Sequence, residues 1–408
     1  MEAEVVLADG TGGRGTAPAG ASRGRHEAVD LRDGGAACGG FDVRRAVANV
    51  DGPVAQALLG MDACDQAAVD GVLVRLDGTD DKSRMGGNAL VAVSMAVLHA
   101  AAAAEGLPLW RHLAGDGRPR LPLPEIQIFG GGAHAGRRVD IQDFLVMPVG
   151  AESFADAIEM AADVYHAAGA LMAGRGRRAG VADEGGWWPD FTSNEEALAT
   201  LAESIAKAGY SQDDVAVSLD VAASEFAVDG RYCLGLDNRQ LEPEEWVELL
   251  LGWVRDYGIA SVEDPLAEDD HEGMAAFTAA VGDRVQVVGD DLLVTDADRV
   301  RLAVKEKACN AVLLKVNQAG TVTEAREAYE AARPAGWGTI VSARSGETED
   351  VIIVHLAVGW DAGQLKVGSM ARSERVAKWN EALRIEEEMG PDATFAGRAA
   401  LPQRWGST

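Results

Sequence analysis

In the second part of this chain, six charged side chains each follow a short apolar run. Acids and bases of these types could together carry out metal-assisted proton transfer. They are Asp220, Glu263, Asp290, Lys315, Arg344 and Lys366. Three acids provide the hard oxygen ligands that suit Mg²⁺. A lysine acts as a base only when it is neutral, so its pKa would have to fall from about 10.4 to roughly 7 to 8. Acids, metal and lysines together are typical of proton abstraction next to a carboxylate, with the resulting dianion held by metal.

The apolar runs before these residues indicate a barrel. They alternate with longer helical patterns and recur about every 30 residues, as βα units do in an eight-stranded barrel. The runs are VAVSLD, IASVED, VQVVGDD, CNAVLLKV, GTIVSARS and GQLKVGS. In a (β/α)8 barrel the carboxyl ends of the strands converge on one face, so the six charges are expected to meet in one mouth. For any one of these residues, the alternative is that charged residues often end strands because the loops that follow are solvated. Six such residues in register favour a functional site.

A break between residues 115 and 124 predicts two domains. The segment GDGRPRLPLP combines turn formers with prolines that cannot continue a helix. Before it, two alternating apolar segments and helical patterns over residues 43–59 and 88–105 indicate a small α+β domain. We therefore expect an α/β protein in which residues 1–118 form the small domain and residues 119–408 form the barrel that carries the site.

Composition narrows the function classes. A formal net charge of −28 over 408 residues makes binding to nucleic acid or to an anionic membrane unfavourable, so we expect neither partner. The opening Met-Glu-Ala-Glu lacks the basic and then apolar form of a signal peptide. The apolar run over residues 89–104 is short for a bilayer span and is expected to be a buried helix. Four scattered cysteines suit reduced thiols. These features predict a cytoplasmic enzyme.

A series of segments resembles the enolase family in enolase order and covers nearly the whole chain. The segments are PAGASRG, DGTDDKSRMGGNA, GGAHAGRRVDIQDF, VADEGG, LDVAASEF, SVEDPLAEDD, VGDDLLVT, LLKVNQAGT, SARSGETED and KVGSMARSER. The resemblance implies an enolase-type (β/α)8 barrel with an N-terminal α+β domain. It also implies a small anionic phosphorylated substrate, two Mg²⁺ sites and a homodimer, in which Glu2 and Arg384 match positions that pair across the enolase dimer.

The resemblance also implies a role for each matching residue. Asp220, Glu263 and Asp290 would bind the first Mg²⁺, and Ser22 would help to bind the second through its backbone. Lys315 would take the proton from C2 of the substrate, Glu184 would act at C3 where hydroxide leaves, and Lys366 would hold the substrate carboxylate. The remaining positions complete the site: Arg344 and Ser345 would hold the phosphoryl group, His134 would lie on a closing loop, and Gln142 would neighbour the site.

Two positions depart from the family pattern. Ala343 stands where enolases carry a histidine between the serine and the arginine of the phosphate-binding segment. Asp143 stands where they carry a catalytic glutamate, which shortens the reach of the carboxylate by about 1.5 Å. A displacement near 1 Å can cost roughly 100-fold in rate. Both changes lie near the group that leaves C3, whereas the residues for proton abstraction match the family.

Three functions are compatible with these observations. The departures favour a specialised relative that forms an enolpyruvate and joins it to another group, of the kind represented by carboxyphosphonoenolpyruvate synthase in phosphinothricin biosynthesis. The alternative is phosphopyruvate hydratase, which converts 2-phosphoglycerate to phosphoenolpyruvate in glycolysis. A non-catalytic relative is the third, and retention of the acids, both lysines, Arg344 and Glu184 argues against it.

Overall fold

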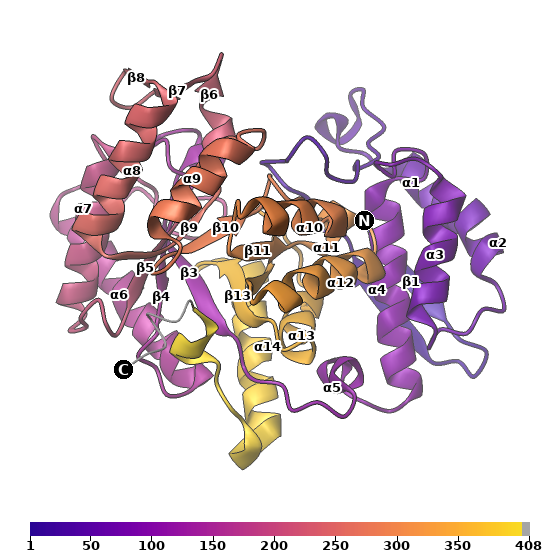
Figure 1. Cartoon of the computed structure of the whole chain (residues 1–408). Helices are drawn as coiled ribbons and strands as arrows, with labels where there is room; N and C mark the ends of the chain where they lie inside the picture. Colours follow the sequence, from indigo (N-terminus) through magenta and orange to yellow (C-terminus); the bar gives the residue numbers. More distant parts are fainter. Residues whose placement is uncertain (402–408) are drawn as a thin grey trace.

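The computed structural model describes residues 1–401, and its N-terminal part is a hairpin packed on a long helix. Strands β1 (Glu2–Val6) and β2 (Gly12–Thr16) pair antiparallel and lie against α4 (Gly87–Ala104) (Figure 1). Glycine permits this close approach, because a Cβ atom at Gly13 or Gly15 would collide with the α4 backbone. The hairpin therefore packs directly on α4.

Short helices complete the N-terminal domain. They are α1 (Arg44–Asn49), the π-helical turn η2 (Val50–Val54), α2 (Ala55–Leu58), α3 (Gln66–Asp77) and α5 (Leu109–Ala114), with a 3-10 turn at Ala37–Gly40. Helix α4 is long and apolar enough to cross a membrane, but 83% of that window is buried inside the protein. It is therefore the core helix of this domain, as the sequence predicts.

Eight strands close into a barrel in the order β10-β11-β12-β13-β3-β4-β5-β9. Their bounds are β3 (Leu123–Gly130), β4 (Asp143–Met147), β5 (Ala216–Asp220), β9 (Ile259–Glu263), β10 (Gln286–Gly289), β11 (Ala311–Leu314), β12 (Gly338–Ser342) and β13 (Gly363–Gly368). Nearly all their residues are buried, as expected for strands covered by helices on the outside and filled by side chains on the inside. The predicted α/β fold, a barrel with a small N-terminal α+β domain, is confirmed.

One strand of the barrel runs against the others. Strand β4 pairs antiparallel with both β3 and β5, whereas the remaining neighbours are parallel. A reversed strand begins at the mouth, where the parallel strands end. Asp143, the first residue of β4, consequently lies beside Asp220, the last residue of β5.

Helices surround the barrel, and several begin with a side-chain cap. They are α6 (Phe154–Gly174), α7 (Asn194–Lys207), α8 (Pro243–Tyr257), α9 (His271–Val281), α10 (Ala297–Glu306), α11 (Val316–Ala319), α12 (Val322–Ala332), α13 (Ile352–Gly359) and α14 (Ser373–Met389). Ser153, Ser193 and Thr321 each accept a hydrogen bond from an N–H in the first turn of α6, α7 and α12. A small sheet of β6 (Ala227–Val228), β7 (Arg231–Leu234) and β8 (Arg239–Leu241) follows β5. The other 3-10 turns are Gly132–Ala135, Ala223–Glu225, Arg333–Ala335, Gly390–Asp392 and Gly397–Ala400.

Candidate active site

One pocket at the mouth of the barrel contains almost every residue that the sequence singles out. Its wall includes Ser22, His134, Gln142, Asp143, Glu184, Asp220, Asp290, Lys315, Arg344, Ser345 and Lys366. Glu263 lies outside this wall but contacts it through Lys366. Ala343 also lines the pocket, and its N–H donates to the carbonyl of Lys366. The structure thus brings together residues that are up to about 340 positions apart in the chain.

Lys366 lies between two of the predicted metal ligands. Its Nζ donates to Asp220 at 2.8 Å and to Glu263 at 2.7 Å. Burial would raise the pKa of Asp220, but the ammonium of Lys366 outweighs this and lowers it to about 2. Burial and the neighbouring Asp220 raise the pKa of Glu263 well above its ordinary value. Lys366 therefore supplies a cation at the point where the acids converge.

Lys315 is paired in the same way with the third predicted ligand. Its Nζ donates to Asp290, which also accepts from the side chain of Gln318 at 2.9 Å. Burial alone would lower the pKa of Lys315, but the carboxylate of Asp290 outweighs it and raises the pKa. This direction is opposite to the fall toward about 7 to 8 that a base requires, because the nearest charge to Lys315 is an acid. A cation that took over Asp290 would remove this effect. The fall stays a prediction for the site with Mg²⁺ bound.

Two acids that the sequence analysis left aside, Asp264 and Asp291, lie beside Asp290. Asp264 accepts the backbone N–H groups of Asp290 at 2.9 Å and of Asp291 at 2.7 Å. Asp264, Asp290 and Asp291 bring carboxylate oxygens within 4.8 Å of one another, and all three are buried. Burial and the charge of Asp290 raise the pKa of Asp264 to about 8 and that of Asp291 to about 9. Asp264 therefore orients the backbone that follows β10.

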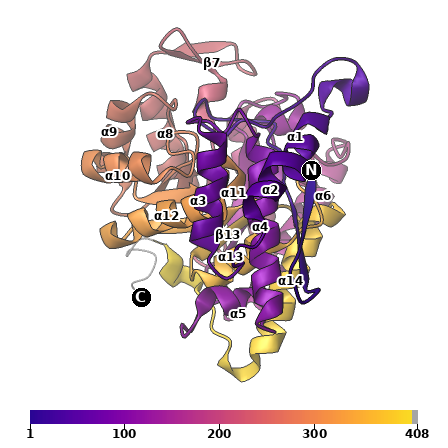
Figure 2. The same ribbon diagram turned by 90° about the vertical axis from the view of Figure 1, so that its right-hand side faces the viewer.

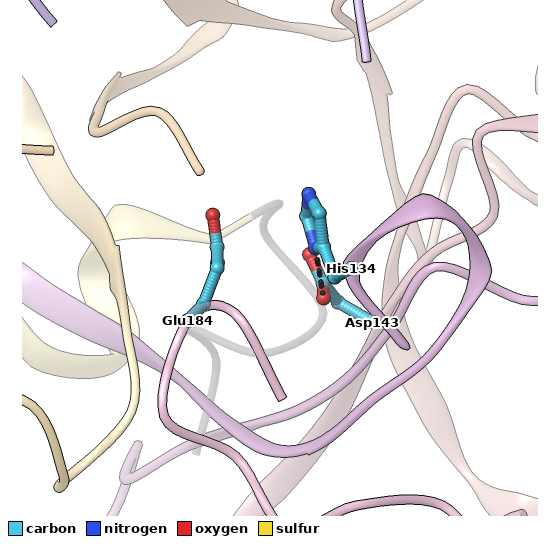
Figure 3. A group of neighbouring side chains, drawn as sticks. All are labelled: His134, Asp143 and Glu184. Atoms are coloured by element: carbon cyan, nitrogen blue, oxygen red, sulfur yellow. Dashed lines mark hydrogen bonds and ion pairs between the residues drawn. The ribbon is translucent and has the colours of Figure 1, made fainter. Parts of the chain in front are cut away.

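His134, Asp143 and Glu184 form a second buried cluster (Figure 3). His134 Nδ1 lies 3.0 Å from Asp143 Oδ1, and Glu184 stands apart on its own loop. Burial would lower the pKa of His134, but the charges of Asp143 and Glu184 raise it to about 9. Gln127, buried on β3, donates to Asp143 and accepts the N–H of Gly186 at 2.8 Å. Gln127 thereby ties the loop that carries Glu184 to the pair of His134 and Asp143.

Arg344 is buried and held by an acid that the sequence analysis missed. It donates to Glu27 at 2.9 and 3.1 Å and to the carbonyl of Ser22 at 2.9 Å. Ser345 Oγ accepts the N–H of Ala21 at 2.6 Å. The loop around Ser22 is therefore fastened to the end of β12, and the predicted phosphoryl-binding and second-metal residues are in direct contact.

Arg375 is another buried residue beside the pocket that the sequence analysis missed. It is fully buried, donates to the carbonyls of Arg344, Val367 and Ser345, and lies 3.7 Å from Glu184. The sequence contains a signal for it: Arg375 falls in line with Trp379 and Ala382 on the buried face of α14. A charged residue on the apolar face of a helix is expected to have buried partners.

Three buried oxygen atoms at the mouth lack a hydrogen-bond partner in the described part of the chain. They are Glu263 Oε1, Gln142 Oε1 and Asp143 Oδ2. Buried acceptors of this kind normally have a partner. With Asp220 and Asp290 they form a set of hard oxygen donors in contact with two ammonium groups, which fits a divalent cation of the Mg²⁺ type.

Comparison with known proteins identifies the family. The model for "Enolase, N-terminal domain" matches residues 1–113, and the model for "Enolase, C-terminal TIM barrel domain" matches residues 119–403. The chain belongs to the enolase family. It is 48% identical over 405 residues to "Enolase 1" of Desulfitobacterium hafniense, with 98% of this chain and 93% of that protein covered. It is also 48% identical over 407 residues to "Enolase" of Acidothermus cellulolyticus, with 99% and 94% covered.

These matches correct the leading functional expectation. A carboxyphosphonoenolpyruvate synthase is the wrong reading, because both relatives are named enolase at 48% identity over nearly the whole chain. The structure supplies a physical reason why one departure carries less weight than expected. Asp143, although one carbon shorter than glutamate, still reaches the pocket, bonds His134 and lies 3.9 Å from Lys366. The chain is an enzyme of the enolase superfamily.

Proposed function

We propose that this chain is a phosphopyruvate hydratase, which removes water from 2-phosphoglycerate to give phosphoenolpyruvate. The observation that supports this most directly is the assembly of Lys315, Lys366, Glu184 and Arg344 around one pocket with three acids. The names of the two relatives agree with this reaction. Lys315 is the residue proposed for proton abstraction from C2, and Glu184 is the residue proposed for loss of hydroxide from C3.

We propose that Asp220, Glu263 and Asp290 hold the first Mg²⁺ and that Ser22 contributes to the second. When bound, Mg²⁺ would stabilise the negative charge that develops on the substrate carboxylate. The Nζ atoms of Lys315 and Lys366 donate hydrogen bonds to these acids. Competition between metal and ammonium for the same acids would free Lys315 from Asp290 and bring its pKa toward that of a base.

The other residues receive their roles from position and chemistry. Lys315 is proposed to take the C2 proton, and Lys366 to hold the substrate carboxylate. Glu184 lies beside the pair of His134 and Asp143, whose proton can assist the hydroxide that leaves C3. The phosphoryl group is assigned to Arg344 and Ser345, with Gln142 positioning Asp220 through a 3.1 Å hydrogen bond. Because Arg344 is paired with Glu27, phosphoryl binding would share this guanidinium or displace Glu27.

The substrate is a small phosphorylated anion, and the enzyme is proposed to work in the cytoplasm as a homodimer. The buried position of α4 and four free cysteines fit that compartment. Within one chain Glu2 lies 3.9 Å from Arg14, and Arg384 is paired with Glu381. Both side chains are at the surface, where a second copy could compete for them.

The test follows phosphoenolpyruvate formation from 2-phosphoglycerate with Mg²⁺. The unmodified protein should turn over, and Lys315→Ala should lose about 10² to 10⁴ in rate while it keeps the fold. Lys305→Ala, which removes an exposed lysine on α10, is the matched control and should retain full activity. A protein that does not turn over 2-phosphoglycerate, or a Lys315→Ala variant with parental exchange of the C2 proton, would overturn the proposal.

A further inference from the structure

A groove of about 480 Å³ lies where the N-terminal domain meets the barrel, at the end opposite to the mouth. Its walls come from α5 and the segment after it, from the end of α12 with the turn η5 (Arg333–Ala335), and from the end of α13. These barrel elements lead into the first residues of β12 and β13, whereas the mouth lies where the parallel strands end. Helix α5 packs against α13 and lies below it in both views (Figure 1 and Figure 2). The groove is therefore separate from the candidate active site.

Three arginines line this groove in a chain whose formal net charge is −28: Arg118, Arg326 and Arg333. Arg118 and Arg333 are exposed, and neither has an ion-pair partner among residues 1–401. Acidic residues outnumber lysine and arginine by 65 to 37 in the whole chain. Guanidinium groups without an acid partner are therefore a local reversal of the charge of this protein.

The two acids that line the groove do not cancel these charges, because each already pairs with another arginine. Glu330 accepts a hydrogen bond from Nε of Arg326 at 2.8 Å. Asp361 accepts two hydrogen bonds from Arg120, at 2.9 and 3.1 Å, in the fork geometry that matches a carboxylate. Two positive charges are therefore left uncompensated by the acids of the wall.

Two of the guanidinium groups are held in place by the aromatic floor of the groove. Arg333 donates to the hydroxyl of Tyr329 at 2.6 Å, and that hydroxyl donates to the carbonyl of Trp360. The guanidinium of Arg326 lies 4.8 Å from the centre of the Tyr329 ring and 5.5 Å from that of Trp360, as in cation–π contacts. Both rings are buried. Because these side chains are already ordered, binding an anion here would cost less conformational entropy.

The loop that carries Arg118 is fastened to the N-terminal domain. Arg111 on α5 donates to the carbonyl of Gly117 at 3.2 Å, and the N–H of Gly117 donates to the carbonyl of Ala114 at 2.9 Å. Arg118 therefore lines the groove from the side of the N-terminal domain, and Arg333 lines it from the barrel. An anion that contacted both guanidinium groups would bridge the two domains.

The size and lining of the groove match a small phosphorylated molecule better than a single small ion. Ligand pockets typically enclose about 300 to 1,000 Å³, and this groove falls within that range. Guanidinium groups bind phosphate oxygens through paired hydrogen bonds. Leu113, Pro119 and Pro334 add an apolar part to the wall, which would contact an uncharged part of the molecule.

We propose that this groove binds a small organic molecule that carries at least two negative charges on phosphate groups. Arg118 and Arg333 bind the anionic oxygens, and Arg326 supplies a third guanidinium beside them. None of the three lines the barrel mouth, and the expected homodimer positions Glu2 and Arg384 do not line the groove. The site goes beyond the proposed hydratase activity.

The first experiment measures binding of inorganic pyrophosphate to the intact chain by calorimetry, without Mg²⁺ because Mg²⁺ itself binds phosphates. We expect a Kd of about 1 mM or tighter. Adenosine diphosphate, which adds an organic part to the same diphosphate, should bind at least as tightly. Arg118→Gln and Arg333→Gln should each weaken binding by about tenfold or more, because each loses a hydrogen bond between charged groups. Arg75→Gln removes an exposed arginine on α3, outside the groove, and should leave the affinity unchanged.

Removal of an acid from the wall should have the opposite effect. Glu330→Gln releases Arg326 from its partner, so pyrophosphate should bind more tightly, by up to about fivefold. Glu244→Gln makes the same change of net charge at an exposed position on α8 and should leave the affinity unchanged. Weaker binding in Glu330→Gln would contradict the proposal.

The second experiment locates the bound anion by amide hydrogen exchange. Pyrophosphate should slow exchange in residues 115–120 and 333–337, which carry two of the arginines. Circular dichroism checks that each variant is folded, independently of any enzyme activity. Absence of binding, failure of adenosine diphosphate to bind, an unchanged affinity in both arginine variants, or slower exchange confined to residues 342–346 at the barrel mouth would each overturn the proposal.

Discussion

Replacing Asp143 with asparagine should change the charge state of His134. The two side chains are buried together, with Nδ1 of His134 3.0 Å from Oδ1 of Asp143. The pKa of His134 is about 9, against 6.5 for an unperturbed histidine. That difference of about 2.5 corresponds to about 3 kcal/mol at 1.36 kcal/mol per pKa unit. Asparagine has nearly the same shape but carries no charge, so burial would then dominate and the pKa should fall below 6.5.

The assay is a pH titration of the histidine ring signals by NMR without added Mg²⁺. His134→Gln identifies the His134 signal among the seven histidines. The parent should titrate near pH 9, and Asp143→Asn should titrate below pH 6.5. His166→Gln, a change outside the site pocket, should leave the His134 signal where it is. A parental pKa near 6.5, or one near 9 that survives Asp143→Asn, would refute the reasoning.

Stability should follow the same titration. The folded pKa of His134 lies above the unfolded value, so the pair contributes its full stability below about pH 6.5 and loses it as the pH rises through about 9. The difference in unfolding free energy between parent and Asp143→Asn should therefore be largest, up to about 3 kcal/mol, at pH 6 and should shrink by about pH 9.5. Denaturant titrations at the two pH values measure this, and a difference that grows with pH would contradict it.

Three further predictions concern the metal, a supporting residue and assembly. A chelator should abolish activity, and added Mg²⁺ should restore it. Asp290→Ala should lose metal-dependent ligand binding, which calorimetry measures. A fully active Asp290→Ala variant would contradict the assignment of Asp290 as a metal ligand. Gln127→Leu removes the hydrogen bonds that link Asp143 to Gly186. If Asp143 or the loop that carries Glu184 then moves by about 1 Å, kcat should fall by roughly 100-fold. An unchanged kcat would show that this link does not position the site. Light scattering at micromolar concentration should give the mass of a dimer, and a monomer mass would refute the homodimer.

The sequence predicts the barrel well but not the direction of each strand. Alternation of apolar runs and helical patterns identifies six of the eight strands, and β3 and β4 are not among the predicted runs. The direction of β4 cannot be predicted either, because an apolar run reads the same in either direction. The reversal matters for the site because it places Asp143, the first residue of its strand, at the mouth of the barrel. The parallel strands reach the mouth with their last residues instead.

The candidate site shows a similar division. Strand ends locate Asp220, Glu263 and Asp290, but the order of residues along the chain does not show which side chains touch. The insertion of Lys366 between two acids depends on packing across the barrel, as does the pairing of Arg344 with Glu27. For this reason, the sequence gives the members of the site but not the pKa direction of its lysines.

The reversed strand also affects the order in which the site can assemble during folding. His134 lies in the loop that joins β3 to β4, and Asp143 begins β4 nine residues further along the chain. Lys366 and Asp220 are 146 residues apart and meet only when the barrel closes. Local hairpins form in roughly 1 to 10 μs. Long-range pairing is slower, because closing a long loop costs chain entropy before the contacts that offset this cost are formed. The pair of His134 and Asp143 can therefore form before Lys366 meets Asp220.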